Sequence, residues 1–157
     1  MKFLTIVSVS FWLGAMIFFS FLVAPTAFSV LDRASAGQLL NVLFPRYYLF
    51  GIGMGALALA GVVGRLVQSG GKEIPWGPLA LLLLMLAMSG FSLLVLLPHL
   101  QALRQAMPGA RPSGAFAQAH RLAVTLNLAT ILAGLALVAI DGLRRPWGLK
   151  IWLKRNR

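Results

Sequence analysis

The residues of this chain that could carry chemistry are few, and its two histidines come first. They flank the turn-forming sequence Pro108-Gly109-Ala110-Arg111-Pro112, His99 eleven residues before Ala110 and His120 ten residues after it. In an antiparallel helical hairpin, residues at matching distances from the turn lie at nearly the same height. Imidazoles are common ligands of copper, zinc and iron, so the pair could share a metal ion or clamp a haem. The chain has no Cys and the only acid expected nearby is Asp32, so interfacial hydrogen bonding is the favoured interpretation.

Asn127 is a candidate binding residue on the same expected helix as His120. Their spacing of seven residues places both on one helical face. Asn127 lies about two turns inside an apolar run, where a buried amide needs hydrogen-bond partners. The hairpin arithmetic puts it at about the height of Leu93, so Ser92, or else Ser89, is predicted to supply that bond. Two roles stay open, a polar contact between helices and the lining of a polar cavity.

A third group of candidates, Arg46, Tyr47 and Tyr48, stands where the second membrane crossing is expected to begin. Tyrosine suits the boundary between water and the apolar membrane interior. An aromatic belt at a re-entry turn is therefore the favoured interpretation, and the alternative makes Arg46 a cation that faces a ligand. Together with the two histidines and Asn127, these residues form the predicted ligand-binding face.

Four apolar helices are expected to position these side chains. Of the 157 residues, 59% are hydrophobic and 11% are charged, where a soluble domain has about 25% charged residues. A helix crosses a bilayer with about 20 apolar residues, and residues 3–31 carry no charge. We therefore predict an all-α integral membrane four-helix bundle in residues 1–143. The predicted spans are about 3–23, 47–66, 79–97 and 120–142.

Between the first two spans, residues 32–44 are predicted to form a short amphipathic helix at the membrane interface. Asp32 can cap the N-terminus of this helix, and its apolar residues fall near one face. Proline interrupts helical hydrogen bonding. Pro25 is therefore expected to end or kink the first helix, and Pro98 to bend the third.

The second span is rich in small residues. Gly51 and Gly55 form one small-xxx-small pair, and Ala56, Ala60 and Gly64 form a longer row. Such rows let helix backbones approach closely in lipid. They predict helix packing inside the bundle or in a homo-oligomer.

The net charge of +11 is distributed between the apolar runs and at the chain end. This pattern favours a bilayer with anionic lipids over nucleic acid as the partner. The first, third and last polar segments hold nine Lys and Arg residues against five in the other two, so both termini are expected in the cytoplasm. Six of the nine lie in the basic juxtamembrane tail, residues 144–157, where Arg144 and Arg145 are expected to neutralise Asp141. The composition suggests a bacterial inner membrane.

Neither enzymatic chemistry nor a cofactor is expected. The chain has three acidic residues, no Ser-His-Asp arrangement with a spacing signal and no phosphate-binding loop. Gly51-Ile52-Gly53-Met54-Gly55 lies inside an apolar crossing with no preceding strand, which argues against phosphate binding.

Several short motifs in order resemble those of a known family. They are Trp12 and Gly14, Leu43-Phe44-Pro45 followed by Tyr47-Tyr48, Pro98, and His120-Arg121-Leu122 followed by Asn127. Over about residues 3–143 the chain resembles the four-helix membrane proteins grouped around human transmembrane protein 205, a family defined by a domain of unknown function. The resemblance implies an integral membrane protein with four helices. Where that family often has a serine three residues after the histidine, this chain has Ala123.

These patterns favour a non-enzymatic membrane protein associated with transport, lipid or assembly. Two alternatives belong to other classes. One is a metal- or haem-binding membrane protein that uses His99 and His120, and the other is an accessory subunit of a larger membrane complex.

Overall fold

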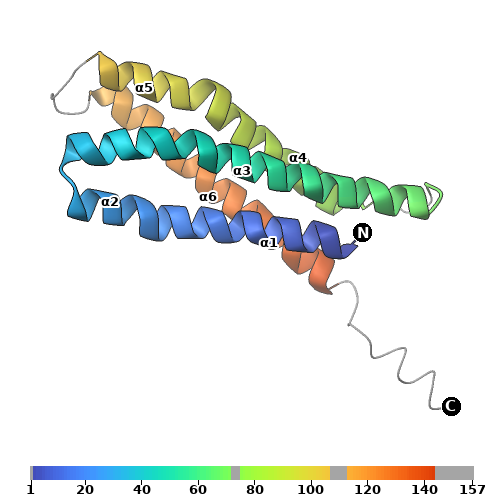
Figure 1. Cartoon of the computed structure of the whole chain (residues 1–157). Helices are drawn as coiled ribbons and strands as arrows, with labels where there is room; N and C mark the ends of the chain where they lie inside the picture. Colours follow the sequence, from blue (N-terminus) through green and yellow to red (C-terminus); the bar gives the residue numbers. More distant parts are fainter. Residues whose placement is uncertain (1, 72–74, 107–112, 144–157) are drawn as a thin grey trace.

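The computed structural model describes residues 2–71, 75–106 and 113–143 of the chain. Every regular element in these ranges is a helix. Several of them join end to end into longer helices, and these longer helices alternate in direction (Figure 1). The elements are α1 (Lys2–Phe18), the π-helix η1 (Phe19–Val23), α2 (Ala24–Val30), α3 (Arg33–Gln68), α4 (Trp76–Phe91), the π-helix η2 (Ser92–Leu96), α5 (Leu97–Gln105) and α6 (Gly114–Leu143).

Joined end to end, these elements make four helices long and apolar enough to cross a membrane. They cover Lys2–Val30, Arg33–Gln68, Trp76–Gln105 and Gly114–Asp141. The predicted all-α four-helix membrane bundle is thereby confirmed. The N-terminus of α1 and the end of α6 lie at one end of the bundle, which we call the proximal end (Figure 1). The opposite end, with the turn between α2 and α3, is called the distal end.

The interfacial helix predicted between the first two spans does not exist as a separate element. Asp32 caps a helix as predicted, because its carboxylate accepts hydrogen bonds from the N–H groups of Ala34 and Ser35. That helix is α3, which continues through Pro45 for 36 residues. Pro45 cannot donate a backbone hydrogen bond. Next to it, the guanidinium of Arg46 donates to the carbonyl of Val42, one helical turn earlier, at 2.8 Å.

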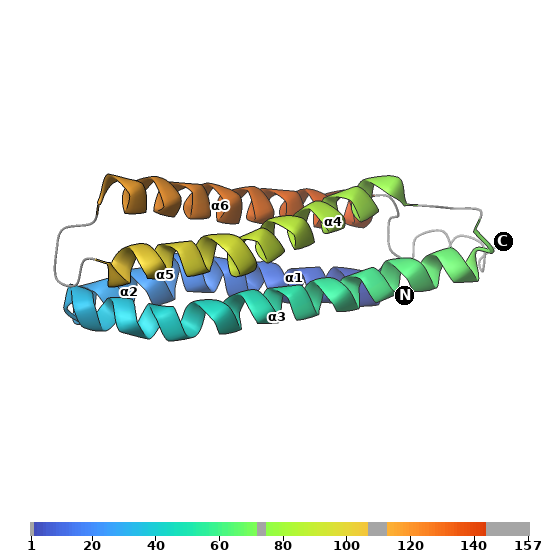
Figure 2. The same cartoon turned by 90° about the horizontal axis from the view of Figure 1, so that it is seen from above.

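Each π-helix is followed by a proline two residues after its last residue, Pro25 after η1 and Pro98 after η2. A proline ring clashes with the carbonyl four residues earlier, and a wider turn relieves such a clash. The first span therefore does not end at Pro25 but continues as α2. The third span curves from α4 into α5, as predicted for Pro98 (Figure 2).

The apolar core lies between α1, α3, α4 and α6. Its members include Val9, Trp12, Leu13, Met16, Ala58, Val62, Leu82, Met85, Ile131 and Leu137. Gly51 and Gly55 are buried, and a Cβ at either position would overlap the indole of Trp12. Both glycines therefore let α3 approach Trp12 of α1 closely.

The longer small-residue row on α3 is not part of this core. Ala56 and Ala60 are exposed and Gly64 is only half-buried, whereas Ala58 and Gly61 are buried. Ala60 and Gly64 therefore do not take the place of Gly51 and Gly55 against Trp12, and their packing in a homo-oligomer stays a prediction.

Candidate functional site

A hydrogen-bonded chain of three side chains joins α3, α6 and η1. The Tyr47 hydroxyl donates to Oδ1 of Asn127 at 2.5 Å, and Nδ2 of Asn127 donates to the Ser20 hydroxyl at 2.9 Å. Both polar atoms of the Asn127 amide are therefore paired, as a buried amide requires. We call Ser20, Tyr47 and Asn127 the polar layer.

The predicted partners of Asn127, Ser92 and Ser89, were wrong. Distance from a hairpin turn gives the height of a residue but not its direction, and Asn127 points toward η1 and α3. Ser92 is buried elsewhere and interacts with the Tyr48 side chain. The partner Ser20 lies in the first span, 107 residues away in sequence, and no local spacing signal marks it.

Aromatic rings surround the Tyr47 end of the polar layer. Phe19 stacks on Tyr47 with ring centroids 4.7 Å apart, and Tyr48 meets Tyr47 edge-on at 5.0 Å. Phe44 contacts both Phe19 and Tyr48. The re-entry turn predicted at these tyrosines is absent, because α3 continues through Pro45. The aromatic rings instead form a cluster that holds the Tyr47 hydroxyl toward Asn127.

A second group of side chains lies nearer the distal end, and we call it the arginine column. The guanidinium carbon of Arg104 is 5.6 Å from the centroid of the Phe116 ring, a cation–π distance. Phe116 stacks on His120 with centroids 6.1 Å apart and an interplanar angle of 5°. Gly37 of α3 is buried, and a Cβ there would overlap the Arg104 guanidinium. Arg104 of α5 is therefore packed against α3 and α6. None of the described residues forms a hydrogen bond or an ion pair with it.

The inner face of α6 shows where the bundle opens. His120, Asn127, Gly134 and Asp141 recur every seven residues on that face. Gly134 and Asp141 are buried and Asn127 is half-buried, but His120 is exposed.

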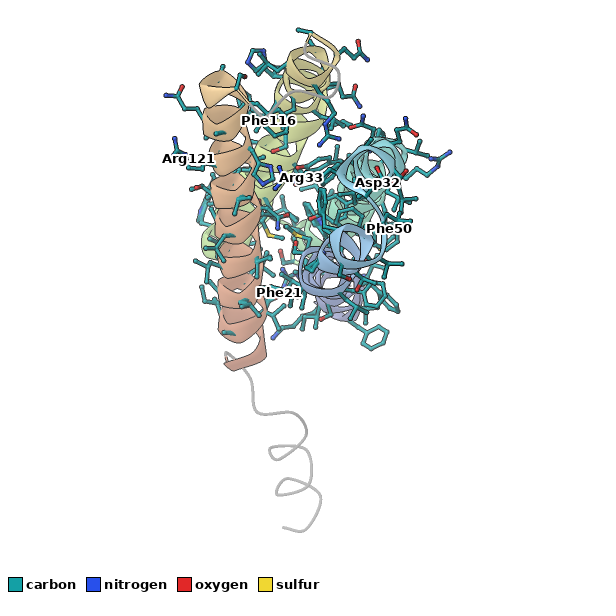
Figure 3. All side chains as sticks on the ribbon, turned by 90° about the vertical axis from the view of Figure 1, so that its left-hand side faces the viewer. Phe21, Asp32, Arg33, Phe50, Phe116 and Arg121 are labelled. Atoms are coloured by element: carbon teal, nitrogen blue, oxygen red, sulfur yellow. The ribbon has the colours of Figure 1, made fainter. Side chains whose placement is uncertain are left out.

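The exposure of His120 follows from the distance between α6 and the elements η1 and α2. No Cα atom of α6 comes within 8 Å of one in η1 or α2, although α6 does approach α1. In Figure 3, viewed from the distal end, the α6 ribbon and the ribbon of the first span lie on opposite sides of the view, with side chains between them. We call the boundary between α6 and η1–α2 the open seam. The exposed residues Phe21, Leu22, His120 and Val124 line it, and the Ser20–Asn127 hydrogen bond crosses it.

The remaining site predictions have mixed outcomes. Arg46 is exposed and its guanidinium donates to the backbone of its own helix, so it does not join the polar layer. His99 and His120 are both exposed. The described residues contain no group of three or more His, Cys, Asp or Glu that could hold a metal ion. Metal or haem binding by the histidine pair remains a prediction.

An ion pair at the proximal end was not anticipated from the sequence. Nη1 of Arg65 lies 3.3 Å from both carboxylate oxygens of Asp141, whose side chain is 5% exposed. The expected neutralising residues, Arg144 and Arg145, lie outside the described residues. The sequence contained a signal for this ion pair, because Arg65 and Asp141 each lie at the end of an apolar span and both spans end on the same side of the bundle.

Comparison with known proteins gives two matches. A family described as a domain of unknown function (DUF4149) matches residues 7–109, which include Ser20, Tyr47 and Arg104. An uncharacterised protein from Aquifex aeolicus (strain VF5) is 36% identical over 137 residues, covering 87% of this chain and 93% of that protein. No solved structure matches.

Proposed function

Because this chain belongs to the DUF4149 family, whose function is unknown, we propose a role from its own residues: a non-enzymatic membrane protein that holds an anionic lipid in its open seam. Lipid association is one of the three roles that the composition favours. The family resemblance to proteins grouped around human transmembrane protein 205 fits the same proposal and supplies no activity of its own.

The open seam itself supports this role most directly. His120 lies on the inner line of α6, yet its side chain is exposed because α6 stands away from η1 and α2. A lateral opening between two membrane helices faces acyl chains along its length. A ligand that enters from the bilayer would therefore meet His120 and then Asn127.

The charge at the distal end argues for an anionic headgroup. Arg104 is half-buried, without a polar partner among the described residues, and fixed by Gly37 and Phe116. An arginine with free donors in a fixed position suits a phosphate oxygen. The described distal residues further include the exposed arginines Arg33 and Arg121, against the single acid Asp32.

The walls of the open seam suit an acyl chain. Phe21 and Leu22 of η1 are exposed, at 71% and 54%, and Figure 3 places Phe21 in the space between the first span and α6. Val124 of α6 is also exposed, at 53%. The core below is filled by Leu13, Met85 and other residues, which argues against a conduction path through one protomer and favours holding a lipid over transporting it.

The orientation proposed from the basic residues puts both termini in the cytoplasm of a bacterial cell and the distal end on the outer side of the inner membrane. The surplus of nine basic residues over five supports this orientation. The lipid would then come from the outer leaflet.

Native mass spectrometry of the purified protein tests the proposal. Wild-type protein is expected to retain phosphatidylglycerol in preference to phosphatidylcholine. The Arg104→Gln/His120→Gln double variant should retain at least about fivefold less, since one hydrogen bond to a charged group contributes about 1.5–3 kcal/mol. Arg46→Gln, which removes an exposed arginine whose guanidinium donates to its own helix, is the matched control. Equal retention by the double variant and the control would overturn the proposal.

A further inference from the structure

The ion pair with Asp141 leaves two nitrogen atoms of Arg65 without a hydrogen-bond partner among the described residues. Nη1 alone contacts Asp141, at 3.3 Å from each oxygen. Nε and Nη2 are buried and have no hydrogen-bond partner within the described part of the chain. A buried charged donor without an acceptor is unfavourable, and such an orphan in a native structure points to a missing water or ion.

The position of these two nitrogens indicates which kind of acceptor they suit. The guanidinium is planar, and its Nε–H and one Nη–H point the same way along one edge. This edge forms paired hydrogen bonds with the two oxygens of a carboxylate or phosphate. We propose that the free Nε–Nη2 edge of Arg65 binds a phosphate-type oxyanion while Nη1 keeps Asp141.

Arg65 lies near the proximal end, three residues before the end of α3. Its side chain is 20% exposed, whereas that of Asp141 is 5% exposed, so the arginine side chain as a whole is the more accessible of the two. Nε and Nη2 are both buried in the ligand-free chain, so the proposal requires the side chains that cover them to move aside while Nη1 stays at Asp141.

The ligand that pairs with this edge adds negative charge, because Arg65 and Asp141 already neutralise each other. A lipid phosphate and a free phosphate share this chemistry.

Nuclear magnetic resonance of the full-length protein tests the proposal directly. Protein labelled with ¹⁵N-arginine, in a phosphate-free maltoside detergent, is titrated with inorganic phosphate and, separately, with short-chain phosphatidylglycerol. The Nε–H of Arg65 is expected to be the arginine resonance most protected from solvent exchange, because that atom is buried. It should shift with one of the two ligands. Saturation by inorganic phosphate identifies a free oxyanion, and a response to the lipid alone identifies a headgroup.

Variants add a second measurement. Arg65→Lys keeps a positive charge facing Asp141 but removes the paired edge, so affinity for the responding ligand should fall at least about tenfold. Arg46→Lys, nineteen residues earlier in α3, should leave that affinity unchanged. An Arg65 Nε–H that responds to neither ligand would mean that water alone occupies the edge and would overturn the proposal. The wild-type titration decides this even if Arg65→Lys fails to fold. Because the site lies at the opposite end from the open seam, it can fail or succeed independently of the proposed function.

Discussion

The hydroxyl of Tyr47 donates to the amide oxygen of Asn127 across the bundle, 80 residues away in sequence. This bond joins the second span to the fourth, and Asn127 passes the connection on to Ser20 in the first. The bond between Ser20 of η1 and Asn127 of α6 crosses the open seam. The polar layer therefore links three of the four spans.

Replacing Asn127 by Leu should destabilise the bundle more than replacing Tyr47 by Phe. The Leu side chain leaves two hydroxyls without their partner, a loss of about 1–3 kcal/mol. Tyr47→Phe removes one bond, and hydrogen bonds between membrane helices average about 0.6 kcal/mol. Reversible unfolding in mixed micelles measures both, with Ser10→Ala at an exposed position as control. If Tyr47→Phe proves the more destabilising of the two, Asn127 is not the centre of the layer.

The glycines of α3 allow a matched comparison within one helix. Gly51→Ala places a methyl group into the Trp12 indole, and overpacking of this kind destabilises by about 1–3 kcal/mol. Gly53→Ala meets nothing within 4 Å and should be neutral or stabilising by up to about 1 kcal/mol, since alanine is the better helix former. Thermal unfolding followed by circular dichroism separates the two. Equal effects would contradict the packing of Trp12 on this face.

Sequence patterns were sufficient to predict the number of helices, their apolar character and their alternating direction. Hydropathy reports where a chain is apolar, but it does not report helix ends. The predicted interfacial helix of residues 32–44 and the predicted span of residues 47–66 are therefore one helix, α3, which continues through Pro45. The π-helices at η1 and η2 had a visible marker in Pro25 and Pro98, because each proline must be accommodated by a local change in the helix.

The site was less predictable because it depends on pairs of residues distant in sequence. Asn127 and Tyr47 were both candidates, but periodicity within one helix cannot say which neighbouring helix a side chain faces. The open seam depends on the distances between helices, which no single helix records. Arg65 was counted only as a topogenic charge, although its partner Asp141 closes the other span at the same end.

Breaking the proximal ion pair should be strongly destabilising. Asp141→Ala leaves the mostly buried Arg65 without its only partner among the described residues, and uncompensated buried charges cost about 3–5 kcal/mol. The Arg65→Leu/Asp141→Leu double variant removes both charges and should recover most of that loss. A double-mutant cycle on unfolding free energies measures the coupling. A double variant no more stable than Asp141→Ala would show that the pair contributes nothing beyond packing.

The start of α3 should depend on pH. Hydrogen bonds from the Ser35 side chain and from the backbone N–H groups of Ser35 and Ala34 hold the pKa of the Asp32 carboxyl below its ordinary value of 3.8. The cap therefore contributes fully above the pKa of the unfolded chain and is lost as the pH falls through the lower folded pKa. Hydrogen exchange of the first turn of α3 should accelerate in that acidic window, and much less so in Asp32→Asn. A carboxyl titration with a midpoint at or above 3.8 would contradict the cap.

The most direct test of the central claim, that the open seam holds an anionic lipid, uses the natural absence of cysteine from this chain. A single bimane-labelled cysteine is placed at Ala123, between His120 and Asn127 on α6, or at Gly14, beside an apolar groove on the lipid-facing side of α1. The protein is reconstituted in nanodiscs containing spin-labelled phosphatidylglycerol or spin-labelled phosphatidylcholine. We predict stronger quenching at Ala123 by phosphatidylglycerol, lost in Arg104→Gln/His120→Gln, and no headgroup preference at Gly14. Equal quenching at Ala123 by both lipids, unchanged in the double variant, would contradict the account.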